Sequence, residues 1–172
     1  VGSEMCIRDS RDTDAAQINH LKNLALDLKR SSQCWIHGYV VCRETEQEAK
    51  EYLNHYVIEK GDDVAVSNML DIFGIESQTL DESVLNEFKF HFKAGHGGYP
   101  LVGTPDQIVS KMQDLSSMGV DGILLSWLDY IDEAHYWIEN VLPRLEQTGL
   151  RAPFTPPLLW TFSFLLNGDY FF

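Results

Sequence analysis

Side chains of types that bind small molecules follow two of the strands that the sequence predicts. Gly103 and Thr104 come directly after one short apolar segment, and Ser126 and Trp127 end another. Backbone N–H groups at the start of a helix favour an anion, and a serine hydroxyl forms hydrogen bonds. An indole packs on a flat ring or closes an apolar pocket. These four residues are therefore the candidates for binding a cofactor.

Each of these candidates also has a purely structural explanation. Asp106 follows in the first helical turn, where its carboxylate complements the helix dipole and would repel a phosphate. Ser126 also suits a cap for the segment that follows it. Trp127 suits a core or interface position equally well. The sequence leaves both explanations open for each residue.

The remaining reactive residue types do not form a recognisable catalytic or metal-binding motif. His91 and His96 are separated by a glycine-containing turn, and no carboxylate completes a metal-ligand spacing. His37 lies inside a strand, where a hydrogen-bonded core histidine is expected. The sequence has no G-x-S-x-G, no P-loop and no G-x-G-x-x-G that opens a helix. No residue is therefore assigned as catalytic or as a metal ligand.

The segment Tyr99–Trp127 predicts the β–α–β unit that positions the four cofactor candidates. Thr104 and Gln107 form a T-x-x-Q capping box, with Pro105 at the first helical position. The helix that follows carries one apolar stripe, and Gly119 suits the left-handed residue that ends it. The short apolar run after this glycine is typical of a parallel strand buried on both faces.

Two further units precede this one. Residues 12–29 form an amphipathic helix, and residues 34–42 form the longest strand candidate. Thr45 with Glu48 is a second capping box, which starts another helix directly after that strand. The sequence therefore predicts strand–helix alternation, as in α/β proteins.

A helical insertion and a last helix complete the pattern. Residues 61–95 contain two helical stretches with a break at Gly74, and the glycine-rich segment 94–98 follows. This segment is either a plain flexible loop or part of a binding site. Residues 131–147 carry an apolar face on one helix, in which Pro143 should cause a kink or break.

Composition excludes several classes of function. The chain has 172 residues and a formal net charge of −13, which argues against binding nucleic acid or an anionic membrane surface. Its 3 cysteines, Cys6, Cys34 and Cys42, form no C-x-x-C and no zinc spacing. They indicate reduced, structural thiols and a cytoplasmic location.

Several motifs together resemble one family, the luciferase-like flavin-dependent monooxygenases. The resemblance is strongest to the branch that acts on alkanesulfonates and dimethyl sulfone. The motifs that carry it are GGYPLVGTP (Gly97–Pro105), GVDGILLSW (Gly119–Trp127), VLPRL (Val141–Leu145) and, more loosely, RETEQEA (Arg43–Ala49). The resemblance implies an α/β fold that is the C-terminal portion of a (β/α)8 barrel, with about three strand–helix units and a helical insertion. A complete barrel needs about 250 residues.

The resemblance also implies a function. The full-length protein would be a two-component monooxygenase that uses reduced FMN from a separate flavin reductase to oxygenate a small organosulfur or similar substrate. Most flavin contacts would lie upstream of this segment, so the fragment alone is expected to be inactive. A homo-oligomer is expected for the full-length protein. The alternatives are a deazaflavin-dependent reductase on the same scaffold and a non-catalytic half-barrel.

The resemblance nominates substrate-binding residues in the insertion, namely Lys93, His96 and Gly97. In the alkanesulfonate branch an arginine just before the glycines handles the anionic end of the substrate, and Lys93 lies within a residue of that place. A lysine offers a point charge without the bidentate fork of arginine. A neutral sulfone therefore suits this chain at least as well as a sulfonate. An exposed lysine at a helix end is the structural alternative.

The sequence divides into three parts. Residues 1–11 resemble a non-native leader, residues 12–151 form the partial barrel domain, and residues 152–172 form a tail of doubtful origin. The leader has no signal-peptide layout, and the tail is too short for a bilayer span.

Overall fold

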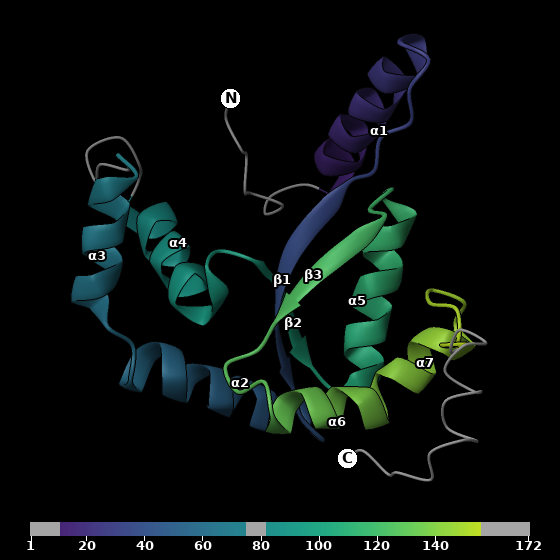
Figure 1. Cartoon of the computed structure of the whole chain (residues 1–172). Coiled ribbons are helices and arrows are strands. Elements are labelled where there is room, and N and C mark those ends of the chain that lie inside the picture. The colour runs from purple at the N-terminus through teal and green to yellow at the C-terminus, as the bar shows by residue number, and fades with distance from the viewer. Residues whose placement is uncertain (1–10, 75–81, 156–172) are drawn as a thin grey trace, which may run out of the picture.

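The computed structural model describes residues 11–74 and 82–155, in which helices alternate with three parallel strands (Figure 1). The elements are α1 (Arg11–Asp27), β1 (Trp35–Cys42), α2 (Glu46–Asn54), a π-helical turn η1 (His55–Glu59), α3 (Asp63–Ile72), α4 (Glu82–Gly95), β2 (Tyr99–Gly103), α5 (Pro105–Ser117), β3 (Gly122–Ser126), α6 (Asp132–Asn140) and α7 (Leu142–Gln147). Residues 1–10 of the predicted leader and most of the predicted tail lie outside the described residues, whereas Arg11 begins α1. No described helix has the length and apolar character needed to cross a membrane.

Both predicted capping boxes are confirmed. The Thr45 hydroxyl accepts from the Glu48 N–H at the start of α2, and the Glu48 carboxylate accepts from the Thr45 N–H. Thr104 and Gln107 make the same reciprocal bonds at the start of α5. These bonds satisfy backbone donors that have no partner inside a helix, and they fix where each helix begins.

The strands follow the spatial order β2-β1-β3. β2 pairs with the C-terminal half of β1, with Cys42 opposite Gly103. β3 pairs with the N-terminal half, with Tyr39 opposite Ser126, so it ends three residues before β1 does. In a (β/α)8 barrel, successive strands are neighbours. β2 and β3 lie on opposite sides of β1, so they are not adjacent strands of a barrel.

Helices cover both faces of β1, because the two crossover connections run in opposite directions across the sheet. On one face, Tyr39 and Val41 pack against α2, η1 and α4. On the other face, Val40 and Cys42 pack against α5, α6 and α7. The five C-terminal residues of β1, Gly38 to Cys42, are all buried, because this strand lies between two other strands and between two layers of helices.

Burial of the flanking elements is lower than the sequence predicts. β3 is not buried on both faces, because Leu124 is 67% exposed. On the apolar face of α1, Ile18 is buried but Leu21 is 63% exposed. Neither element has a described neighbour on its outer side, so its apolar residues lack the cover that their pattern predicts.

The insertion and the last helix agree with expectation. α3 and α4 are separated at Gly74, which has a positive φ of 70°. α4 reaches the sheet at its end, where Ala94 belongs to the same buried cluster as Tyr39 and Val41 of β1. The Tyr56 hydroxyl of η1 donates to the Ala94 carbonyl oxygen at 2.9 Å. The predicted last helix divides at Val141 into α6 and α7, with Pro143 in the first turn of α7. This proline therefore starts a new helix.

Candidate functional site

The most developed polar arrangement on the sheet is a pair formed by His37 of β1 and Ser126 of β3. His37 Nε2 and Ser126 Oγ are 2.9 Å apart, and both side chains are partly buried. Burial, and then the charge of His96, lowers the pKa of His37 below its usual value of 6.5. The imidazole is therefore neutral at pH 7 and offers one donor and one acceptor.

A second pair lies one step along the same face of β1. The Tyr39 hydroxyl and His91 Nδ1 of α4 are 2.9 Å apart, so the insertion contributes a ring to the sheet surface. Side chains at alternate strand positions share a face, which places Tyr39 on the side of His37. We call the residues His37, Tyr39, His91, His96 and Ser126 the His37 cluster.

The turn after α4 brings the glycine-rich segment to this cluster. His96 has a left-handed φ of 54°, and its N–H donates to the Phe92 carbonyl oxygen at 2.9 Å. Gly97 also has a positive φ, and its N–H donates to His91 O at 3.0 Å. A Cβ on Gly98 would lie 2.7 Å from His37 Nδ1. This segment is a hydrogen-bonded helix end, and its last glycine allows it to approach His37.

Lys93, the third predicted substrate-binding residue, is bound inside the insertion. Its Nζ lies 2.7 Å from Asp63 Oδ1 of α3, and its side chain is 10% exposed. Lys93 therefore joins α4 to the start of α3. An anionic substrate would have to compete with Asp63 for this charge.

The predicted cofactor residues are divided by β1. Gly103 lies beside Cys42 on one side of β1, whereas Ser126 lies on the other side. The Thr104 hydroxyl is engaged by the helix cap, and a Cβ on Gly103 would lie 2.4 Å from Gln107 Oε1. The β2–α5 turn is therefore occupied by its own cap and offers little room for a phosphate.

Trp127 differs from the other candidates because its indole N–H is not satisfied. The Nε1 atom is buried and has no hydrogen-bond partner among the described residues. Its ring contacts Tyr130 and Trp137 edge to face, with centroids 5.5 and 5.8 Å away. A buried donor without a partner is uncommon in folded proteins, which sets Trp127 apart from the other three candidates.

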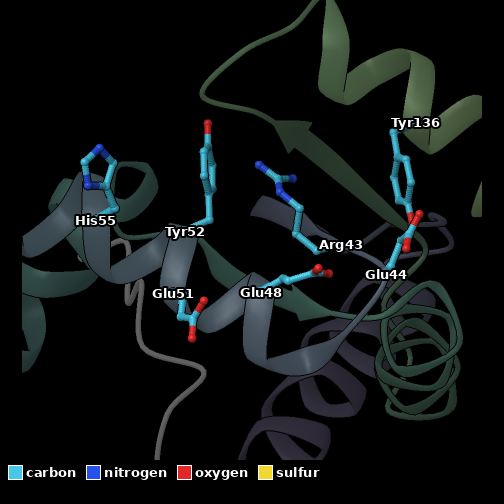
Figure 2. A pocket seen from close by; sticks show the side chains of 7 residues that line it. All are labelled: Arg43, Glu44, Glu48, Glu51, Tyr52, His55 and Tyr136. Carbon is cyan, nitrogen blue, oxygen red and sulfur yellow. The ribbon is translucent and has the colours of Figure 1, made fainter.

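An open cavity of about 700 Å³ lies beyond the carboxyl end of β1. Figure 2 shows the side chains that line it, which are Arg43, Glu44, Glu48, Glu51, Tyr52, His55 and Tyr136. The carboxyl ends of strands are where parallel α/β folds place their ligands. Because three of the lining residues are glutamates, the cavity repels phosphate and suits a neutral or cationic group.

Arg43 ties the wall of this cavity to α6. Its Nη2 donates to Glu133 Oε1 at 2.7 Å, and its guanidinium lies 3.9 Å from the centroid of the Tyr52 ring. Glu133 is 8% exposed and also accepts from the Asp129 N–H at 3.0 Å. The pair therefore holds the loop after β3 against the end of β1. Position alone nominates Arg43 from the sequence, because it directly follows the longest strand.

Sequence reasoning missed three members of the cluster and the buried Glu133. Alternating polar residues in an otherwise apolar strand, at His37 and Tyr39, are the signal that could have identified this face. His91 and Glu133 carry no such signal, since their partners are 52 and 90 residues away in the sequence. Within the described residues, no group of three or more His, Cys, Asp or Glu is placed to hold a metal ion.

Comparison with solved structures shows the fold that this chain shares with other proteins. The chain shares a TM-score of 0.66 with the crystal structure of DmoA from Hyphomicrobium sulfonivorans, at 17% identity, over 87% of this chain and 38% of DmoA. That likeness confirms the predicted α/β class and partial barrel. No family model matches the chain.

Sequence relatives confirm the resemblance to flavin-dependent monooxygenases. The chain is 28% identical over 142 residues to the FMNH2-dependent dimethylsulfone monooxygenase of Pseudomonas fluorescens, covering 80% of this chain and 39% of that protein. It is 29% identical over 126 residues to the sulfoquinovose monooxygenase of Agrobacterium fabrum, covering 65% of this chain and 33% of that protein. The chain thus spans about two fifths or less of the length of these relatives.

Proposed function

We propose that this chain is part of an FMNH2-dependent monooxygenase that oxygenates a small organosulfur compound. The observation that carries the proposal is the similarity to the dimethylsulfone and sulfoquinovose monooxygenases, which extends over most of this chain. Both relatives act on compounds that contain a carbon–sulfur bond. The whole protein would receive reduced FMN from a separate flavin reductase and would be a homo-oligomer.

The residues at the end of β3 support a flavin site. The unsatisfied Trp127 indole N–H is a donor that an oxygen of a bound flavin would accept. Reduced flavin supplies the oxygen-activating chemistry when it is bound, and the protein binds, orients and excludes water. The Ser126 hydroxyl and the neutral His37 imidazole would hydrogen-bond the ring or the substrate. Gly103 and Thr104 contribute less, because the cap occupies their turn.

The His37 cluster favours an uncharged substrate over an anion. The neutral His37 imidazole and the hydroxyls of Tyr39 and Ser126 offer hydrogen bonds and carry no permanent positive charge. Lys93 forms an ion pair with Asp63. Of the three predicted substrate-binding residues, His96 and Gly97 therefore remain for contact with a substrate at the His37 cluster. Sulfone oxygens accept hydrogen bonds without carrying a full charge. We therefore favour a sulfone over a sulfonate as substrate.

The two alternative functions have unequal support. Nothing favours a deazaflavin-dependent reductase. Both relatives are named as monooxygenases of sulfur compounds, and the first is named as FMNH2-dependent. A non-catalytic half-barrel has one observation in its favour. Trp35 and Leu124 of the sheet are 62% and 67% exposed. A complete barrel would cover these two apolar side chains.

The test of the proposed function uses the longer reading frame that contains this chain. The purified protein is mixed with a flavin reductase, NADH, FMN and ¹⁸O2, together with dimethyl sulfone, sulfoquinovose or an alkanesulfonate. We expect one ¹⁸O atom in the product of a sulfone substrate. A product without ¹⁸O, or turnover that needs deazaflavin, would contradict the proposal.

A flavin titration examines the local site, first in the present chain and then in the full-length enzyme that contains it. Under anaerobic reducing conditions, quenching of the protein's tryptophan fluorescence and thermal stability report binding. Replacing Trp127 by phenylalanine removes the indole N–H and keeps the ring packing. If Trp127 binds flavin, this variant of the full-length enzyme has a raised FMN Kd, while an Ile72→Ala variant on α3 does not. Equal Kd values would remove Trp127 from the site.

A further inference from the structure

Glu133 is the only charged side chain that is buried among those that the structure describes, with 8% of its surface exposed. It lies in the first turn of α6, where a carboxylate also complements the helix dipole. Burial of a carboxylate has a cost that its partners must offset, and replacing a buried ion pair with apolar residues is often neutral or stabilising. Stability alone therefore gives no reason for a carboxylate at this position.

Both carboxylate oxygens of Glu133 accept hydrogen bonds, and they do so from different parts of the chain. Oε1 accepts from Arg43 Nη2 at 2.7 Å, and Oε2 accepts from the Asp129 N–H at 3.0 Å. Asp129 Oδ1 in turn accepts from the Ile131 N–H at 2.8 Å and from the Asp132 N–H at 3.3 Å. A glutamine has one carbonyl oxygen and one NH2 group, so it would leave one of the two donors to Glu133 facing another donor. This geometry therefore requires a carboxylate.

Arg43 is itself fixed on two further elements. Its Nη1 donates to the Cys42 carbonyl oxygen at the end of β1, at 2.8 Å. Its guanidinium lies 3.9 Å from the centroid of the Tyr52 ring of α2, and Figure 2 shows the two side chains beside each other. A planar guanidinium can form both hydrogen bonds and the ring contact at once, which an ammonium group cannot reproduce. The Arg43–Glu133 pair therefore ties the turn after β3 to β1 and α2.

Trp127 begins the turn that Glu133 holds, and its ring packs against both sides of it. The ring centroids of Tyr130, in the turn, and of Trp137, in α6, lie 5.5 and 5.8 Å from that of Trp127. Trp137 is buried and lies one helical turn after Glu133. The Nε1 atom of Trp127 is buried and has no partner within the described part of the chain. The orientation of this N–H is therefore set by a turn and a helix whose relative position Glu133 fixes.

We propose that Glu133 is a positioning residue of the flavin site, an inference that rests on the proposed function. Together with Arg43, it holds the turn after β3 so that the Trp127 indole N–H is already oriented before FMN binds. Glu133 acts through the turn and α6, since its carboxylate is occupied by its own two donors. A donor that is oriented in advance loses less conformational freedom on binding, which strengthens binding. Loss of the Glu133 carboxylate should consequently weaken FMN binding only while Trp127 is present.

A double-mutant cycle tests this coupling in the full-length enzyme. The Kd of reduced FMN is measured by anaerobic ultrafiltration for the wild type, Glu133→Gln, Trp127→Phe and the double variant. We expect Glu133→Gln to raise the Kd about threefold to tenfold when Trp127 is present, and to leave it nearly unchanged in the Trp127→Phe background. An equal rise in both backgrounds, or no rise in either, would overturn the proposal. A wild-type enzyme that binds no FMN would instead overturn the proposed function, and this inference with it.

Asp121→Asn is the matched control for the loss of a carboxylate. Asp121 Oδ2 accepts from Lys22 Nζ and from the Cys34 N–H, both at 2.7 Å, so this residue has the same two kinds of donor as Glu133. Asp121 directly precedes β3, at the opposite end of that strand from Trp127. The Asp121→Asn variant should keep the FMN Kd within about twofold of the wild-type value. A rise as large as that in Glu133→Gln would show a general effect of lost stability and would overturn the assignment.

Exchange of the indole N–H groups gives a second measurement, which needs no bound flavin. The Arg43→Lys variant keeps a positive charge beside Glu133 but loses the planar fork of donors. In ¹H–¹⁵N NMR spectra of the 172-residue chain, the Trp127 indole N–H should exchange with water faster in this variant than in the wild type. The Trp35 indole N–H, which donates to Gln33 Oε1 at 3.1 Å, should exchange at the same rate in both proteins. Equal exchange of the Trp127 indole N–H in the two proteins would overturn the role of the Arg43–Glu133 pair.

Discussion

Removal of the Glu133 carboxylate gives the sharpest test of how the end of β1 is held. In the Glu133→Ala variant, Arg43 loses its partner at 2.7 Å and the Asp129 N–H loses an acceptor at 3.0 Å. The guanidinium of Arg43 stays beside Tyr52, partly buried and without its counter-charge. The variant should therefore be less stable, with the effect concentrated in the loop after β3.

The magnitude follows from burial of the two partners. Breaking a fully buried ion pair by removing one partner costs about 3–5 kcal/mol. The Glu133 side chain is 7% exposed, but that of Arg43 is 25% exposed, so water compensates part of the loss. We expect a decrease of about 2–3 kcal/mol in the free energy of unfolding, which corresponds to about 4–12 °C in Tm for a domain of this size.

Urea unfolding at pH 7, followed by circular dichroism, measures this change for Glu133→Ala, Arg43→Met and the double variant. The double variant should lose about 1–2 kcal/mol less than the sum of the single variants, because each single variant strands one charge. Glu59→Gln, in the exposed pair with His55, is the control and should leave the midpoint unchanged. A loss below about 0.5 kcal/mol for Glu133→Ala, or additive single variants, would refute the reasoning.

Three further predictions concern titration, reactivity and packing. Because the pKa of His37 is lowered by burial and by His96, its neutral form stabilises the fold above about pH 6.5, and this contribution disappears as the pH falls. An NMR titration should place the midpoint of His37 below 6.5, and this midpoint should be higher in the His96→Gln variant. An unshifted midpoint would contradict this prediction. Burial raises the pKa of the Cys42 thiol to about 12, so maleimide at pH 8 should label Cys42 only as fast as the protein unfolds, as mass spectrometry of the labelled peptide can show. Gly95→Ala would place a Cβ 2.2 Å from Tyr39 Cβ and should cost about 1–3 kcal/mol of unfolding free energy in urea, whereas an unchanged midpoint would show that α4 can move away from the sheet.

The elements that the sequence predicts well are those whose determinants are local. The capping boxes at Thr45 and Thr104 need only residues three positions apart, and both are present in the structure. The helix break around Pro143 is local in the same way. Local signals of this kind, together with periodicity, therefore identify the strands and helices of this chain.

Arrangements that depend on distant contacts could not be predicted. The order β2-β1-β3 depends on which strand is buried on both faces, and an apolar run does not distinguish β3 from a central strand. Ser126 was a candidate for its position at a strand end, but its partner His37 is 89 residues away. The helix cap at Thr104 explains why one half of the predicted cofactor site is already occupied.

The central position of β1 has a consequence for the protein during its synthesis. β1 emerges from the ribosome about 57 positions before its first partner, since it ends at Cys42 and β2 begins at Tyr99. At translation rates of about 5–20 residues per second, this apolar strand waits roughly 3–11 s without a partner on either side. α2 and η1, which follow at once and pack on Tyr39 and Val41, can shield one of its faces during that interval. The nascent chain is therefore most exposed to chaperones and to aggregation before α5 has left the ribosome.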